Sequence, residues 1–265
     1  MSRVALIAGA GDLPAELASH LPQPVLVCAL AGVTPPLAVD LEFRFERLVP
    51  FLRALGDRGV DTVVMAGAIH RPRLDPALFD RDTAGMVPQM LAAMQGGDDA
   101  ALRWVIGLIE SFDLRVAGIA ELAPALLLEQ AIHTRAPTAA EQADAARGIS
   151  ILAALDDVDV GQGCAVASGL CLGVEALFGT DALLSDVARH RHTREPQAGG
   201  VFIKRAKAGQ DLRADLPTIG PGTIAAAQAA GLTGLCVQAG HIIVLRRAET
   251  LATAQAAGIA LWAVP

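Results

Sequence analysis

The most unusual stretch of this chain is GQDLRADLPTIGPGT, which holds a lone carboxylate, Asp215, in front of a long uncharged segment. From Leu216 to Leu245 the chain has no Asp, Glu, Lys or Arg. A carboxylate can bind a metal ion or accept a proton from water, so a residue in this setting can carry hydrolytic chemistry. The stretch alone leaves open whether Asp215 is a surface residue or a catalytic one.

A second candidate is Glu175, which lies in the otherwise apolar run GVEALFGTDALL. A buried acid needs a cationic partner or a metal ion, and Lys204 or Lys207 could supply the positive charge. The same run contains Thr180 and Asp181 near an expected helix start, where an acid also suits the helix dipole. The turn Gly161-Gln162-Gly163 is expected near the same strand ends.

Near the N-terminus, LIAGAGDLPAEL places Gly9 and Gly11 between an expected strand and an expected helix. Small residues there allow a ligand to approach the backbone, and helix amides can bind phosphate, so a nucleotide or phosphate site is one interpretation and a tight turn the other. The dinucleotide fingerprint fails because Pro14 occupies the third glycine position. A dehydrogenase is therefore disfavoured.

The loop MAGAIHRPRL follows the expected third strand and contributes His70, Arg71 and Arg73. Loops at the carboxyl ends of parallel strands bind ligands in open α/β sheets. Arginine can bind phosphate with two parallel hydrogen bonds. A solvated loop arginine is the simpler alternative.

Composition limits the function classes. The chain has 265 residues and a net charge of −7, which disfavours binding to nucleic acid. We expect a cytoplasmic protein because no secretory signal pattern opens the sequence. Its four cysteines lack a C-x-x-C pair and are expected to be buried thiols. The uncharged stretch contains prolines, glycines and His241, so we expect a helix and buried strands there rather than a membrane span.

The expected elements indicate an α/β protein. Strand-like RVALIA, VLVCAL and DTVVMAG alternate with helical segments near 14–20 and 51–57, which predicts a parallel sheet with helices on its faces. The stretch LLEQAIHTRAPT is expected to be a linker, because Thr138 and Glu141 form a capping-box pattern that starts a new helix. We therefore expect two domains, residues 1–135 and 136–265.

Two segments in the second half are alike at a spacing of 27 residues, TIAAAQAAGLTGLCV from Thr223 and TLATAQAAGIALWAV from Thr250. Each reads as a helix that ends at a glycine, Gly231 or Gly258, and leads into a strand. Duplication and convergence on one helix-to-strand solution explain the likeness equally well.

Several short motifs occur in an order that resembles the LpxI family of UDP-2,3-diacylglucosamine pyrophosphatases. They are LIAGAGDLP, GAIHRP, GDDAALR, DVGQG, VEALFGTDALL, DLPTIG and GLTGLCVQAG, and they run from about residue 3 to residue 264. The resemblance implies a Rossmann-like N-terminal domain, a distinct C-terminal catalytic α/β domain and a nucleotide-lipid site between them. It also implies release of UMP and lipid X after water attacks the α-phosphorus, as a step of lipid A biosynthesis.

The resemblance further implies a divalent ion, typically Mg²⁺, and makes Asp215 of DLPTIG the essential aspartate. Metal ligand is the preferred role for Asp215, with Glu175 and Asp181 as expected further ligands; general base is the alternative. Lys204 is an expected catalytic residue. The residues expected to bind substrate are Gly9, Gly11, Asp12, Arg71, Gln162, Thr180 and Thr218.

The substrate class implies a peripheral contact with the cytoplasmic surface of the inner membrane, and a homodimer is an option that the sequence leaves open. Two alternatives from other classes remain. One is a non-catalytic nucleotide-sugar or lipid binding protein of the same fold, and the other is an oxidoreductase that uses the N-terminal glycine turn.

Overall fold

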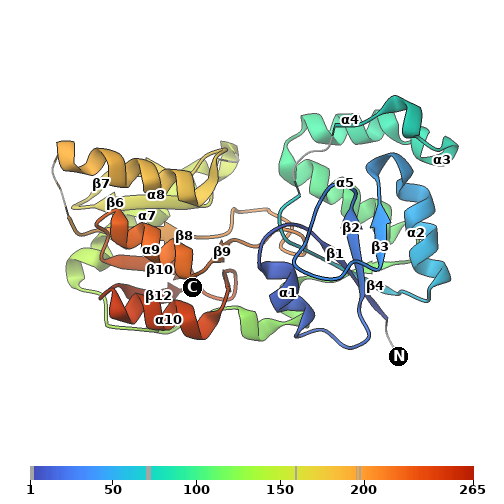
Figure 1. Ribbon diagram of the computed structural model, residues 1–265. Helices are drawn as coiled ribbons and strands as arrows, with labels where there is room; N and C mark the ends of the chain where they lie inside the picture. The colour runs from blue at the N-terminus through green and yellow to red at the C-terminus, as the bar shows by residue number, and fades with distance from the viewer. Residues whose placement is uncertain (1–2, 70–72, 159, 195, 197) are drawn as a thin grey trace. The chain divides into compact units, whose positions relative to one another are not determined.

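A computed structural model describes residues 3–69, 73–158, 160–194, 196 and 198–265 (Figure 1). The chain forms two compact α/β units. The first unit comprises Met1–Pro124 together with Asp211–Asp215, and the second comprises Ala125–Gln210 together with Leu216–Pro265. The α/β class expected from the alternating strand and helix patterns is confirmed.

The first unit is built on a five-stranded parallel sheet. Its strands are β1 (Val4–Ala8), β2 (Leu26–Leu30), β3 (Leu41–Phe43), β4 (Thr62–Ala66) and β5 (Arg115–Val116), in the order β3-β2-β1-β4-β5. This is the strand order of doubly wound α/β domains. Buried strands of parallel sheets read as continuous apolar runs, and all five residues of β1 and β2 are buried.

The helices of the first unit are α1 (Leu13–Ala18), α2 (Leu48–Asp57), α3 (Arg81–Ala84), α4 (Val87–Gln95), α5 (Asp98–Glu110) and α6 (Ile119–Leu122). Helix α2 is amphipathic and buries Phe51, Leu52 and Leu55. These side chains form one apolar core with residues of the sheet and with Ile106 and Ile109 of α5. Helix α5 begins at Asp98.

The second unit has its own five-stranded sheet, in the order β12-β10-β8-β6-β7. Strands β8 (Val201–Lys204), β10 (Gly234–Gln238) and β12 (Ala260–Val264) are parallel, whereas β6 (Gly163–Ala167) pairs antiparallel with β8 and with β7 (Leu170–Val174). A separate pair joins β9 (Thr218–Ile219) to β11 (Ile243–Val244). The sheet of the second unit is therefore mixed, while that of the first is parallel.

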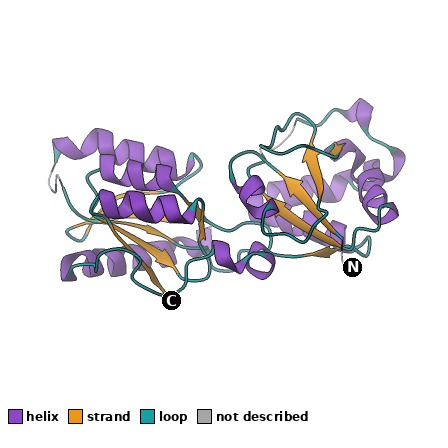
Figure 2. Cartoon of the chain, turned by 60° about the horizontal axis from the view of Figure 1, so that its bottom comes forward, coloured by secondary structure: helices purple, strands orange, loops and turns teal. Residues whose placement is uncertain are grey.

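Helices cover both faces of this mixed sheet (Figure 2). Helix α7 (Ala139–Leu155) packs on one face, and α8 (Gly179–His190), α9 (Pro221–Ala229) and α10 (Arg247–Ala256) supply apolar side chains to the other. The capping box of Thr138 and Glu141 at the start of α7 is confirmed. The two similar segments are confirmed as helix-to-strand units, α9 with β10 and α10 with β12.

The junction between the units lies at Pro124 and Ala125 rather than near residue 135. The stretch expected to be a linker packs on the second unit because its apolar side chains are needed there: Leu128 is fully buried, and Ile132 forms a β-bridge with Trp262. The chain also returns to the first unit at Asp211–Asp215, which a division into 1–135 and 136–265 does not include.

The uncharged segment after Asp215 forms β9, α9, β10 and β11, and much of it is buried in the second unit. Its lack of charge therefore follows from its place in the core. Among the described residues, no helix has the length and apolar character that crossing a membrane requires.

Candidate active site

The turn that carries Asp215 is held against helix α5 of the first unit by Arg213. The guanidinium of Arg213 donates to both carboxylate oxygens of Asp211, at 3.0 and 2.7 Å, and to Oε1 of Glu110 at 2.7 Å. The amide of Asp211 donates to Oδ1 of Asp99 at 3.3 Å. The hydrogen bonds from Arg213 lower the pKa of Asp211, so this pair is charged at neutral pH. Asp215 thus belongs to the first unit.

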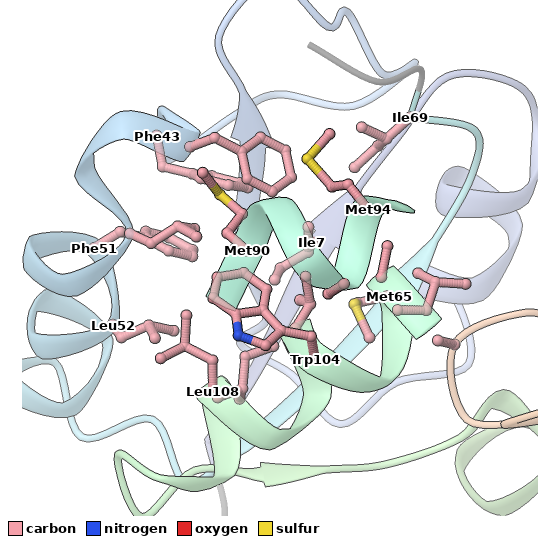
Figure 3. Close-up of a pocket in the computed structure, with 18 of the residues that line it drawn as sticks. Ile7, Phe43, Phe51, Leu52, Met65, Ile69, Met90, Met94, Trp104 and Leu108 are labelled. Carbon is pink, nitrogen blue, oxygen red and sulfur yellow. The ribbon is translucent and has the colours of Figure 1, made fainter. Parts of the chain in front are cut away.

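Asp215 borders an apolar cavity of about 370 Å³ within the first unit (Figure 3). The cavity lies between the sheet and helices α2, α4 and α5, and its lining includes Phe51, Met65, Met90 and Trp104. Of the described residues that line it, Asp215 is the one with a charged side chain. A carboxylate therefore stands beside a space that suits hydrocarbon.

The second unit contains a compact polar cluster formed by Lys204, Glu175 and Thr180. Nζ of Lys204 donates to Oε2 of Glu175 at 2.9 Å and to Oγ1 of Thr180 at 2.5 Å, and Thr180 donates to the same Glu175 oxygen at 2.8 Å. The side chains of Lys204 and Glu175 are 5% and 12% exposed. The expectation that Lys204 compensates the buried Glu175 is confirmed.

The Gly161-Gln162-Gly163 turn encloses Glu175. A Cβ at Gly161 would overlap the carbonyl of Glu175, and one at Gly163 would lie 2.6 Å from its Oε2. The amide of Glu175 donates to the carbonyl of Gly163 at 2.7 Å. The two glycines are therefore required by close packing around the acid. The side chain of Gln162 donates to Gln210 at 3.0 Å.

The remaining expected residues of the second unit lie apart from this hydrogen-bonded cluster. Asp181 is exposed in the first turn of α8, a position that suits the helix dipole. Thr218 begins β9, and its hydroxyl donates to the carbonyl of Leu216 at 3.2 Å. Arg71 lies outside the described residues.

At the N-terminal turn, the missing side chain of Gly9 allows another backbone segment of the same protein to pack closely against it. A Cβ at Gly9 would lie 2.5 Å from the carbonyl carbon of Gly67, and the amides of Gly9 and Ala10 donate to the carbonyls of Ala66 and Ala68. Gly11 has a φ of 91° with open space around its Cβ position, and Asp12 is the N-cap residue of α1. Gly11 and Asp12 thus face a more open surface than Gly9 does.

Comparison with known proteins covers nearly the whole chain. The model of the LpxI N-terminal domain matches residues 3–126, and that of the LpxI C-terminal domain matches residues 129–262. The UDP-2,3-diacylglucosamine pyrophosphatase LpxI of Caulobacter vibrioides is 32% identical over an alignment 270 residues long, which covers 98% of this chain and 96% of the relative. The chain belongs to the LpxI family.

For this LpxI-family chain, the expected ligand set of Asp215, Glu175 and Asp181 does not fit a preformed magnesium site. Oε2 of Glu175 already accepts hydrogen bonds from Lys204 and Thr180, and a bound ammonium competes with a cation for that oxygen. In the part of the chain that the structure describes, no three Asp, Glu, His or Cys side chains gather as ion ligands.

Sequence reasoning missed the anchor and the cavity of this LpxI-family chain. Arg213 stands two residues before Asp215, but its partner Glu110 is 103 residues away, so no local pattern links them. The sequence feature that could have indicated the cavity is the run MVPQMLAAM, which includes most of α4. It places Met90 and Met94 one helical turn apart, and both line the cavity. Methionine enrichment of that kind occurs at adaptable binding surfaces.

Proposed function

We propose that this protein hydrolyses the pyrophosphate bond of UDP-2,3-diacylglucosamine in lipid A biosynthesis. Water attacks the α-phosphorus, and the products are UMP and lipid X, which is 2,3-diacylglucosamine 1-phosphate. The observation that carries this proposal is similarity along the whole chain to a relative named for that activity. The apolar cavity bordered by Asp215 supports it, because the substrate combines a diphosphate with hydrocarbon chains.

Asp215 is proposed as the catalytic carboxylate. An ordinary aspartate has a pKa near 4 and is a weak base at neutral pH, so binding a cation suits it better than accepting a proton from water. The anchor through Arg213 and Glu110 supports this role, since a group that orients a reaction must itself be held in place.

Magnesium is proposed to arrive with the diphosphate. Mg²⁺ is commonly bound by one or two carboxylates together with substrate phosphates rather than by an all-protein cage. Asp215 is the residue that would hold it, and the ion would neutralise phosphate charge. This arrangement does not require Glu175 or Asp181 as ligands.

Lys204 is proposed to bind the substrate diphosphate, with Glu175 and Thr180 as its positioning residues. An ammonium group has three hydrogen atoms, and the bonds to Glu175 and Thr180 use two of them. A third donor directed at phosphate would stabilise negative charge during the reaction.

A peripheral membrane contact is proposed for the loop before helix α8. Leu177 and Phe178 are 88% and 83% exposed. Adjoining exposed apolar side chains are a feature of sites that contact membranes or other proteins. Flotation with vesicles that contain the substrate lipid should retain the protein, and the Leu177→Ser/Phe178→Ser variant should stay with the soluble fraction. Equal flotation of both proteins would contradict this contact.

The decisive experiment for the reaction is turnover of UDP-2,3-diacylglucosamine with Mg²⁺ in oxygen-18 water, followed by mass spectrometry. Label in UMP and unlabelled lipid X would support attack at the α-phosphorus, whereas label in lipid X would place attack at the other phosphorus. Tight substrate binding without turnover would favour a binding protein of the same fold. Omitting Mg²⁺ in parallel samples tests the metal proposal separately.

A further inference from the structure

The cavity of the first unit is too large to be a packing defect. Protein interiors are packed about as densely as organic crystals and contain few voids larger than a water molecule, whose share of liquid volume is roughly 30 Å³. This cavity measures about 370 Å³, which is within the range of small-molecule sites. A space of that size in a small α/β unit is large enough to admit a ligand.

The described part of the lining suits hydrocarbon better than it suits a nucleotide or a phosphate. Aliphatic, aromatic and methionine side chains make up the described lining apart from its glycine and Asp215. An uncompensated phosphate or uracil there would lose its hydration without gaining hydrogen bonds. Hydrocarbon has no hydrogen bonds to water to lose on entering such a space, and it gains the free energy of leaving water.

Methionine makes this lining adaptable. Met65, Met90 and Met94 all border the cavity, and the chain has five methionines in all. Unbranched thioether side chains have several rotatable bonds and adjust to ligands of variable shape. Figure 3 shows Met65 and Met94 on one side of the cavity, Phe51 and Leu52 on the other, and Trp104 between them.

We propose that this cavity binds one linear acyl chain of the substrate, with Asp215 bordering the polar end of the site. This inference rests on the proposed function, to which it adds the location and number of the acyl chains bound in the first unit. The cavity volume is near the lower limit for small-molecule sites, which favours one chain over two. Trp104 and the side chains of α2 then limit the length of the chain.

A direct test uses the fluorescence of Trp104 in the full-length protein. The chain has two tryptophans, Trp104 in the cavity lining and Trp262, which is buried on β12 in the second unit. Titration with brominated n-alkanols of increasing length should quench Trp104 and leave Trp262 unaffected. Affinity should rise about four-fold per added methylene until the cavity is full.

The tryptophan variants assign the signal. Trp262→Phe should retain the quenching, and Trp104→Phe should lose it. Equal quenching in both variants, or no dependence on alkyl length, would overturn the inference. Circular dichroism and a cooperative thermal transition establish that each variant is folded.

Filling the cavity provides a second test. Ala93 on α4 lines the cavity, whereas its neighbour Ala92 is exposed, so Ala93→Phe and Ala92→Phe form a matched pair. Ala93→Phe should weaken alkanol binding at least ten-fold and shift substrate preference toward shorter acyl chains through KM. Ala92→Phe should behave as the unmodified protein. Unchanged binding and KM in a folded Ala93→Phe variant would refute the acyl site.

The two proposals can fail separately. Turnover of UDP-2,3-diacylglucosamine without quenching of Trp104 would overturn the acyl cavity and leave the proposed function intact. Length-dependent quenching without turnover would leave a hydrocarbon site in place and overturn its assignment to this substrate.

Discussion

Arg213 and Glu110 are 103 residues apart in the chain, and their side chains meet at 2.7 Å. This ion pair fastens the turn that ends in Asp215 to helix α5 of the first unit. Both side chains are more than one third exposed, so the pair contributes little to overall stability. Its importance is that it fixes the position of the turn that carries Asp215, the proposed catalytic residue.

Arg213→Ala should reduce kcat by about ten- to a hundred-fold with a small change in KM, because a small displacement of a reacting group is costly. Thermal stability should change little. Arg213→Lys should restore part of kcat, and Arg189→Ala serves as a control because Arg189 forms an exposed pair with Asp186. A proportional loss of kcat and folded fraction would show that Arg213 has only a structural role.

Asp215→Asn should fold normally and lose at least a hundred-fold in kcat, because it removes the charge and retains the shape. Asp186→Asn is the matched control, since Asp186 is exposed on α8. Steady-state rates and unfolding curves of both variants should be measured together. Wild-type turnover by purified Asp215→Asn would refute its assigned role.

Lys204→Met should destabilise the second unit by about 3–5 kcal/mol, because it leaves the buried carboxylate of Glu175 without its cation. The Lys204→Met/Glu175→Gln variant should recover much of that loss, since no buried charge remains. Denaturant unfolding measures both effects. Arg53→Met, which breaks an exposed pair with Asp82, should cost less than about 1 kcal/mol.

The stability of the second unit should fall in acid because of Glu141. Burial alone would raise its pKa, but hydrogen bonds from Arg135, Thr138 and Thr233 hold it at about 2, below the ordinary 4.5. A depressed pKa stabilises the folded state above pH 4.5, and that contribution is lost as the pH falls from 4.5 toward 2. It amounts to about 3 kcal/mol at neutral pH.

The stability difference between the wild type and Glu141→Gln should therefore be largest near pH 7 and should shrink below pH 4.5. Denaturant unfolding at a series of pH values measures this difference. A constant difference across that range would contradict the assignment, whatever the acid sensitivity of other carboxylates.

Cys171 should be the one described cysteine that reacts readily with a thiol reagent in the native protein. It is exposed, whereas burial raises the pKa values of Cys28, Cys164 and Cys236 to about 12, so these thiols are protonated at pH 8. Mass spectrometry should find one label before denaturation and four afterward. Native labelling of Cys171→Ser at the same rate would contradict this assignment. The sequence-based expectation of four buried thiols was wrong at Cys171.

Local patterns predicted most of the elements. The apolar runs of β1, β2 and β4, the capping box of α7 and the two helix-to-strand units near the end were all identified from the sequence. Each depends on neighbours within a few residues, which sequence periodicity and capping rules can detect. Strand β3, only three residues long, was missed.

The candidate site could be predicted only in pieces. The pairing of Lys204 with Glu175 was foreseen because a buried acid needs compensation. The assignment of Asp215 to the first unit was not foreseen, because it depends on Glu110 and Asp99, which are far away in the chain. For Gly9 the sequence pattern suggested that a ligand approaches the backbone. In the structure, tight packing against Gly67 explains why this position is a glycine.

The return of Asp211–Asp215 to the first unit also bears on how such a gene can be divided. The family models meet between residues 126 and 129, which invites a cut at that point. The first fragment would then encode the apolar cavity without its carboxylate, and the second would encode the carboxylate without the helix that anchors it. Neither fragment alone would contain both Asp215 and the helix that anchors its turn.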